Sequence, residues 1–135
     1  RSLDYANYIN ATGCGNSFNA DSMVSTRLII DSLKYWLNEM RVDGFRFDLA
    51  VTICRESHAG SYYAFDSNCG FFKACFANEE IQHALMVAEP WDPGLGGYHL
   101  GGFPRGWSKT IAIEMQFVSS GVVIAAYLVS LPLAF

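Results

Sequence analysis

The sequence has little positive charge and no block of like charges. It carries 9 lysine and arginine residues against 13 aspartate and glutamate residues, which gives a formal net charge of −4 and an isoelectric point near 5.2. A protein that binds nucleic acid needs a basic surface, so this balance argues against a nucleic-acid partner. Because no run of five like charges occurs, the sequence predicts no charged tail.

The cysteines lack the spacing of a metal site. We interpret them as reduced thiols, which favours a reducing compartment and a cytoplasmic protein over a disulfide framework or a metal centre. No feature of the sequence indicates a cofactor, and we expect neither a cofactor nor a metal. The chain has four cysteines, and they form neither a Cys-x-x-Cys pair nor a Cys/His ligand pattern: Cys14, Cys54, Cys69 and Cys75.

What the sequence does contain is a large share of apolar residues. Its 135 residues, 51% of them hydrophobic, suffice for one domain or for one piece of a larger one. Residues 23–40 predict a helix because apolar side chains recur there at steps of three and four residues. Asp21 or Ser22 is expected to cap its first turn. The apolar positions of this helix are Ile29, Leu33, Trp36, Leu37 and Met40.

The apolar period then changes to two in the segment DGFRFDLA, residues 43–50, which predicts a strand. A short helix is expected around residues 71–76, followed by a second apolar strand at residues 85–88 that Pro90 terminates. Strands separated by the length of a crossover predict an α/β fold with parallel strands. In the first strand, one face is expected to carry Val42, Gly44, Arg46 and Asp48, and the apolar face Asp43, Phe45, Phe47 and Leu49.

Each predicted strand ends in a carboxylate. Asp48 and Glu89 occupy equivalent places, and reacting groups collect at this edge of α/β sheets. Two such carboxylates can divide the work of glycoside hydrolysis, because one attacks carbon while the other protonates the leaving oxygen. Arg46 can hold Asp48 ionised, and apolar neighbours would raise the pKa of Glu89. The alternative is a purely structural arginine–aspartate pair and a solvated glutamate.

Four short stretches resemble the α-amylase superfamily of glycoside hydrolases. DGFRFDLA and VAEPWD look like two of its motifs, and TGCGNSFN is similar to its isoamylase branch. GGYHLGGFPRGW resembles the bacterial glycogen debranching enzymes in particular, and the similarity runs from about residue 8 to residue 107. The resemblance implies a (β/α)8 barrel, a retaining mechanism, and hydrolysis of α-1,6-glucosidic branch points in a glycogen-like glucan.

The resemblance also implies roles for individual residues. Asp48 corresponds to the nucleophile, Glu89 to the acid/base, and Arg46 to the partner of the nucleophile. Trp91 and Asp92 follow the acid/base in the family's pattern and, together with Arg46, are the expected substrate-binding residues. For Trp91, filling the core is an equal alternative to lining the glucan site.

Two further aromatic residues, Tyr98 and Phe103, lie in a matched loop. Either could stack on sugar, although packing within the loop is the favoured interpretation. Cys14 and Asn16 belong to another matched loop, which they are expected to shape rather than to contact sugar.

The chain departs from the family in its extent. A complete barrel takes roughly 250 residues, whereas the resemblance covers only the third helix to the fifth strand, in residues 1–108. The family's earlier motif, an aspartate and a substrate-binding histidine, is expected before Arg1, and its later histidine–aspartate motif beyond Phe135. Because the third catalytic acid is not among these residues, we expect the isolated chain to be inactive.

Residues 109–135 form an atypical apolar tail. Residues 115–135 carry no charged side chain, which is enough length to span a bilayer, but no cluster of lysine or arginine flanks them. We favour a shifted or wrongly extended reading frame over a segment packed on the fragment or a membrane anchor. Two other functions stay open, namely a non-catalytic glucan-binding or regulatory fragment and, less favoured, a membrane-associated protein anchored by this tail.

Overall fold

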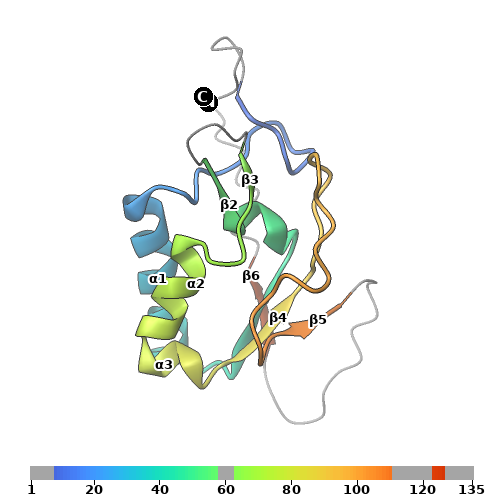
Figure 1. Ribbon diagram of the computed structural model, residues 1–135. Coiled ribbons are helices and arrows are strands. Elements are labelled where there is room, and N and C mark those ends of the chain that lie inside the picture. Colours follow the sequence, from blue (N-terminus) through green and yellow to red (C-terminus); the bar gives the residue numbers. More distant parts are fainter. Residues whose placement is uncertain (1–7, 58–62, 111–122, 127–135) are drawn as a thin grey trace.

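The computed structural model describes residues 8–57, 63–110 and 123–126 (Figure 1). Its helices are α1 (Met23–Asn38), α2 (Gly70–Ala77) and α3 (Glu79–Gln82), with a 3-10 helix, η1, at Ala50–Cys54. Its strands are β1 (Gly44–Phe47), β2 (Arg55–Glu56), β3 (Ala64–Phe65), β4 (Leu85–Ala88), β5 (Ser108–Lys109) and β6 (Val123–Ala126). The two predicted helices and the two predicted strands are confirmed, but β1 is shorter than predicted. It ends at Phe47, so Asp48 and Leu49 lie beyond it, and Leu49 has a left-handed rather than an extended backbone.

Four strands form one sheet in the order β5-β4-β1-β6, and every neighbouring pair is parallel. In the central pair, Arg46 of β1 lies opposite Val87 of β4, and Phe47 lies opposite Ala88. The prediction of an α/β fold with parallel strands is therefore confirmed. The described strands form an open run of four, so this part of the chain does not display the closed barrel that the resemblance implies.

The connection between β1 and β4 begins with two elements that the sequence did not predict. η1 follows β1 directly, and β2 pairs with β3 as a short antiparallel hairpin beyond the C-terminal ends of the sheet strands (Figure 1). All five residues of η1 are buried. Apart from Thr52 this pentapeptide is apolar and shows no periodicity, which is why it gave no signal for either helix or strand.

The apolar tail contributes one strand to the sheet. β6 pairs with β1 over its whole length, with Arg46 opposite Ala125. Residues 111–122 and 127–135 of the tail lie outside the described residues. In the described part of the chain, no helix combines the length and the apolar character needed to cross a membrane.

α1 forms where predicted but is capped differently. Ser22 is its N-cap residue, yet its side chain makes no capping hydrogen bond. The Asp21 carboxylate instead accepts a hydrogen bond from the Ser57 amide at 3.0 Å. The helix ends at Asn38, so Met40 lies beyond it and is 50% exposed rather than buried. The predicted side-chain cap and the predicted inclusion of Met40 in the helix are therefore wrong.

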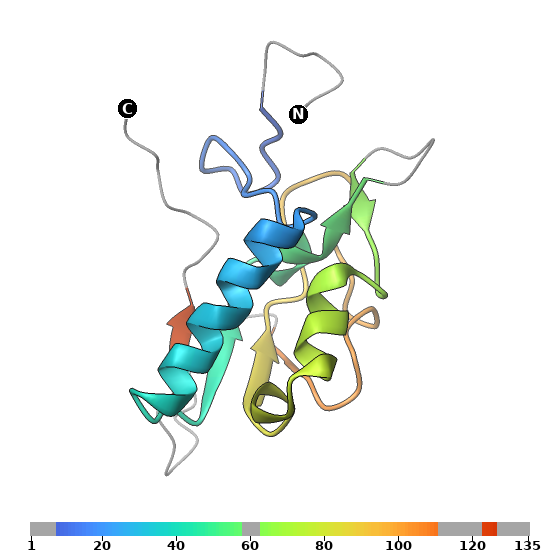
Figure 2. The ribbon, with the colours of Figure 1, turned by 90° about the vertical axis from the view of Figure 1, so that its left-hand side faces the viewer.

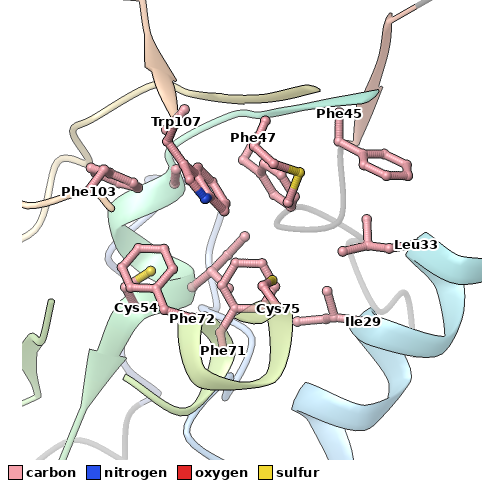
Figure 3. Packing of buried hydrophobic residues seen from close by; sticks show 14 of the residues in the cluster. Ile29, Leu33, Phe45, Phe47, Cys54, Phe71, Phe72, Cys75, Phe103 and Trp107 are labelled. Carbon is pink, nitrogen blue, oxygen red and sulfur yellow. The ribbon is translucent and has the colours of Figure 1, made fainter. Parts of the chain in front are cut away.

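The core lies between one face of the sheet and the helices. Figure 2 shows α1 and α2 lying across the same face of the sheet. Phe45 and Phe47 point from β1 towards these helices and are 1% and 0% exposed (Figure 3). Burying such a side chain stabilises a fold by about 1.5–3 kcal/mol. Phe47 packs on Phe71 and Trp107, and its ring centroid lies 5.7 Å from that of Phe71 and 5.2 Å from that of Trp107 (Figure 3).

This packing leaves the opposite face of β1 for polar side chains. Residues alternate across a strand, so burial of Phe45 and Phe47 on the helix side directs Arg46 to the other side. Its side chain is 17% exposed. The alternation predicted from DGFRFDLA is confirmed for these three residues, and it places the first charged residue of the candidate site.

Candidate active site

The site lies where β1 and β4 end. The parallel ladder continues past both strands, because the Glu89 amide donates to the Phe47 carbonyl and the Ala50 amide donates to the Glu89 carbonyl, both at 3.0 Å. These bonds keep the residue after β1, Asp48, beside the residue after β4, Glu89. The two carboxyl groups thus meet although they lie far apart along the chain: Leu49, the residue after Asp48, is 40 positions from Glu89.

Arg46 joins the two carboxyl groups. Its Nη1 lies 3.2 Å from Asp48 Oδ1, and its Nη2 lies 3.5 Å from Glu89 Oε1. The side chain of Asp48 is 36% exposed, whereas that of Glu89 is only 7% exposed. Three of the five predicted site residues are therefore in one cluster, with one carboxyl group reaching solvent and the other enclosed.

The surroundings of Glu89 favour its protonated form. Burial raises the pKa of Glu89, and a hydrogen bond to the Asp48 carboxyl raises this pKa further. The Leu49 amide, which donates to Glu89 Oε2 at 3.1 Å, and the Arg46 guanidinium both act in the opposite direction. Since the pKa is raised overall, the pair can hold one proton between two carboxyl groups at a pH where exposed carboxyls have lost theirs.

Asp92 lies outside this cluster. Its side chain is 0% exposed, and its Oδ1 lies 2.8 Å from Nη2 of the buried Arg55. A carboxylate that is enclosed and already paired cannot reach a sugar without breaking that pair. The structure therefore favours internal support over the expected substrate contact for Asp92.

Trp91 is half-buried and lies beside the exposed Tyr98. The two residues form an isolated antiparallel bridge, and the His99 amide donates to the Pro90 carbonyl at 2.9 Å. Tyr98 is 61% exposed, whereas Phe103 is 6% exposed and packs on Phe72 with ring centroids 5.7 Å apart. The packing interpretation thus holds for Phe103 but not for Tyr98.

The loop around Cys14 and Asn16 is held by its own polar groups. The Cys14 amide donates to Thr12 Oγ1 at 3.2 Å, and the Ala11 amide donates to Ser17 Oγ at 2.7 Å. These short-range bonds shape the loop, and the bond from the Cys14 amide is consistent with the structural role expected for Cys14. Cys14 is exposed, and the other three cysteines are buried; all four are free thiols.

The sequence reasoning missed three residues around the site. Leu49 supplies the amide that contacts Glu89, and Thr52 and Arg55 contact Asp92. A backbone amide leaves no mark in a sequence. Arg55, in contrast, is visible in the sequence as a lone arginine directly after the mostly apolar run AVTIC. If that run is buried, the arginine needs a buried partner. Among the described residues, no group of three or more histidine, cysteine or acidic side chains could hold a metal ion.

Comparison with known proteins identifies the relatives of this site. No family model matches the chain. The glycogen debranching enzymes of Yersinia pseudotuberculosis (serotype O:1b, strain IP 31758) and Yersinia pestis (bv. Antiqua, strain Angola) are each 44% identical to it over 102 residues, or 76% of the chain. The chain is homologous to a segment of these glycogen debranching enzymes. The enzyme of Yersinia enterocolitica (serotype O:8 / biotype 1B) is 41% identical over the same length.

The homology confirms the resemblance to bacterial glycogen debranching enzymes. The chain spans only 14% of the length of these curated relatives. The activity of a whole glycogen debranching enzyme therefore cannot be assigned to this segment from the homology alone. Membership of the α-amylase superfamily is inferred from the motifs DGFRFDLA and VAEPWD, which are typical of that superfamily.

Proposed function

We propose that this chain carries the catalytic carboxyl pair of a glycogen debranching enzyme. The parent protein would hydrolyse α-1,6-glucosidic branch points of a glycogen-like glucan and retain the configuration of the sugar. The observation that carries this proposal is the Arg46 guanidinium bridging Asp48 and Glu89 at the ends of adjacent strands. The names of the homologous Yersinia proteins support a branched glucan as the substrate.

The two carboxyl groups differ in the way that the proposed chemistry requires. In the first step, the Asp48 carboxylate bonds to the anomeric carbon while Glu89 gives its proton to the departing glycosidic oxygen. In the second step, water attacks the same carbon, Glu89 accepts its proton, and the Asp48 carboxylate leaves. The enclosed, proton-retaining Glu89 and the more exposed Asp48 suit these two roles.

The separation of the carboxyl groups supports retention over inversion. Inverting glycosidases hold their two carboxyl groups about 6.5–9.5 Å apart so that water fits between them and the sugar. Here Asp48 and Glu89 share a hydrogen bond and a single guanidinium. Such a contact is closer than the separation in inverting enzymes, which favours a retaining mechanism.

Two aromatic side chains are the candidates for binding glucan beside the pair. Trp91 follows Glu89 by two residues, and the bridge to Tyr98 sets the two aromatic residues opposite each other. Tyrosine and tryptophan offer flat apolar faces together with one polar atom, which suits the alternating faces and hydroxyls of a sugar. Of the two, Tyr98 presents more surface, since it is 61% exposed.

The test is a chimaera in which this segment replaces its homologous segment in the Yersinia pestis enzyme. The chimaera should release linear chains from glycogen, and Asp48→Asn should reduce that turnover by orders of magnitude because covalent catalysis is lost. Asp31→Asn is the matched control, since Asp31 is 64% exposed in a surface pair on α1. Equal turnover of the Asp48 and Asp31 variants would refute the assignment of the nucleophile.

The isolated chain provides the complementary experiment. We expect it to show no hydrolysis above that of its Glu89→Gln variant, because the chain spans only 14% of the length of its curated relatives. Clear hydrolysis above this blank would show that the pair suffices by itself. Retention on glycogen with no hydrolysis in the chimaera would favour the non-catalytic glucan-binding function.

A further inference from the structure

A second charged cluster is formed by residues that follow the carboxyl pair in the chain. Arg55 and Asp92 are 3% and 0% exposed, and Arg55 donates to the two carboxylate oxygens of Asp92 through Nε and Nη2, both at 2.8 Å. Thr52 Oγ1 donates to Asp92 Oδ2 at 3.0 Å, and the Gly94 amide donates to Oδ1 at 2.9 Å. Four donors therefore fix the Asp92 carboxylate, and the two from the arginine fork also fix its plane.

Arg55 makes further contacts with the backbone. Its Nη1 donates to the Tyr63 carbonyl at 3.1 Å, and its Nη2 donates to the Leu95 carbonyl at 3.0 Å. One side chain thus joins three stretches of chain: β2, where it lies, the residue just before β3, and the loop after β4. Buried charges of this kind are stable only when every donor and acceptor has a partner.

Two of the segments tied together through Asp92 closely follow the two proposed catalytic carboxyl groups. η1, which contains Thr52, begins two residues after Asp48, and Asp92 lies three residues after Glu89. Between them, the Leu49 amide donates to Glu89 Oε2 at 3.1 Å. The backbone bonds of Phe47 and Ala50 with Glu89 already hold this turn on the β4 side, and the Thr52 and Arg55 contacts with Asp92 tie the residues after it to the loop after β4.

Leu49 itself has a backbone conformation that needs support. Its φ is 46°, in the left-handed region that non-glycine residues rarely occupy. Such a conformation persists only where the surrounding structure enforces it. The buried contacts of η1 with Asp92, which start three residues after Leu49, supply that enforcement.

We propose that Arg55 is a positioning residue: through Asp92 it locks the turn after β1 against the loop after β4, and so holds the Leu49 amide and the Asp48 carboxyl against Glu89. The importance of this role for catalysis rests on the function proposed above. The placement itself does not, because the geometry of Glu89 can be measured whether or not the chain hydrolyses glucan.

The test is the titration of Glu89 in the full 135-residue chain, followed by carbon-13 NMR of labelled glutamate, with Glu89→Gln identifying the signal. Arg55→Lys keeps the buried charge but loses the fork, and should loosen the turn. Water would then reach Glu89 and its contact with Asp48 would weaken, and both changes lower the pKa of Glu89. Loss of the Leu49 hydrogen bond acts in the opposite direction but is the smaller effect, so this pKa should fall towards that of an exposed glutamate. Thr52→Val, which removes one of the four donors to Asp92, should shift this pKa in the same direction by less.

Arg27→Lys is the matched control, because Arg27 is 84% exposed and pairs with Asp31 on the surface of α1. A lowered melting temperature with an unchanged Glu89 titration, in folded Arg55→Lys or Thr52→Val, would overturn the proposal and leave Arg55 a purely structural residue. If Arg55→Lys does not fold, Thr52→Val decides alone. An inactive chimaera with the titration shifted as expected would refute the proposed function but not the positioning.

Discussion

Replacing Arg55 with alanine is expected to destabilise the chain far more than the same change at Arg27, although each arginine forms one ion pair. The Arg27–Asp31 pair is 3.5 Å long with side chains 84% and 64% exposed, whereas the Arg55–Asp92 pair is 2.8 Å long with side chains 3% and 0% exposed. The contrast therefore compares a buried, fully hydrogen-bonded pair with an exposed one.

The magnitude follows from what each substitution leaves behind. Arg55→Ala leaves a charged carboxylate without its partner in a dry interior, which typically costs about 3–5 kcal/mol. Arg27→Ala removes an exposed pair between residues one helical turn apart, typically worth about 0.3–0.5 kcal/mol. The difference between the two variants should thus be about 3 kcal/mol or more in the free energy of unfolding.

The assay is urea unfolding of both variants at neutral pH, followed by circular dichroism. The double variant Arg55→Ala/Asp92→Asn separates the lost pair from the stranded charge: removing that charge should restore part of the stability, so the two changes should not be additive. Effects of Arg55→Ala and Arg27→Ala within 1 kcal/mol of each other would contradict the account. So would strict additivity in the double variant.

Three further predictions concern the pH dependence, the thiols and the core. Because the folded state raises the pKa of Glu89 above its ordinary value of 4.5, the folded chain binds more protons than the unfolded chain, and its stability should fall as the pH rises from 4.5 through the raised value; Glu89→Gln should flatten this slope in urea titrations. Cys14 should react at once with a disulfide reagent and the three buried thiols only after unfolding, because burial denies them the reagent and also raises the pKa of Cys75 to about 12; four fast thiols in the native chain would contradict this. Phe47→Ala should cost about 3–5 kcal/mol in the same urea assay, against less than 1 kcal/mol for the half-exposed Phe76, and equal losses would refute the core assignment.

The fold around β1 was predictable because its signals are local. Alternation in DGFRFDLA set Phe45 and Phe47 against Arg46, and the structure buries the two rings and leaves the guanidinium on the other face. The end of β4 was equally predictable, because Pro90 has no amide for the ladder. The bounds Leu85–Ala88 agree with the expectation.

What the sequence did not predict depends on contacts between distant residues. Asp92 stands next to Trp91 in a motif, and nothing local distinguishes a carboxylate that faces sugar from one that faces Arg55, 37 positions away. The same holds for the Leu49 amide, whose role follows from the fold of the turn rather than from its leucine side chain. The pairing of β6 with β1 was also missed, because an uncharged tail shows no period that marks a strand.

The most direct test of the central claim is to trap the sugar on the nucleophile. The Glu89→Gln chimaera with the Yersinia pestis enzyme should be incubated with α-glucosyl fluoride, whose fluoride leaves without help from an acid. Digestion and mass spectrometry should then find one glucosyl unit on the peptide that contains Asp48, because hydrolysis of the intermediate lacks its base. An adduct on another carboxylate, or none in a chimaera that hydrolyses glycogen when Glu89 is present, would contradict the account.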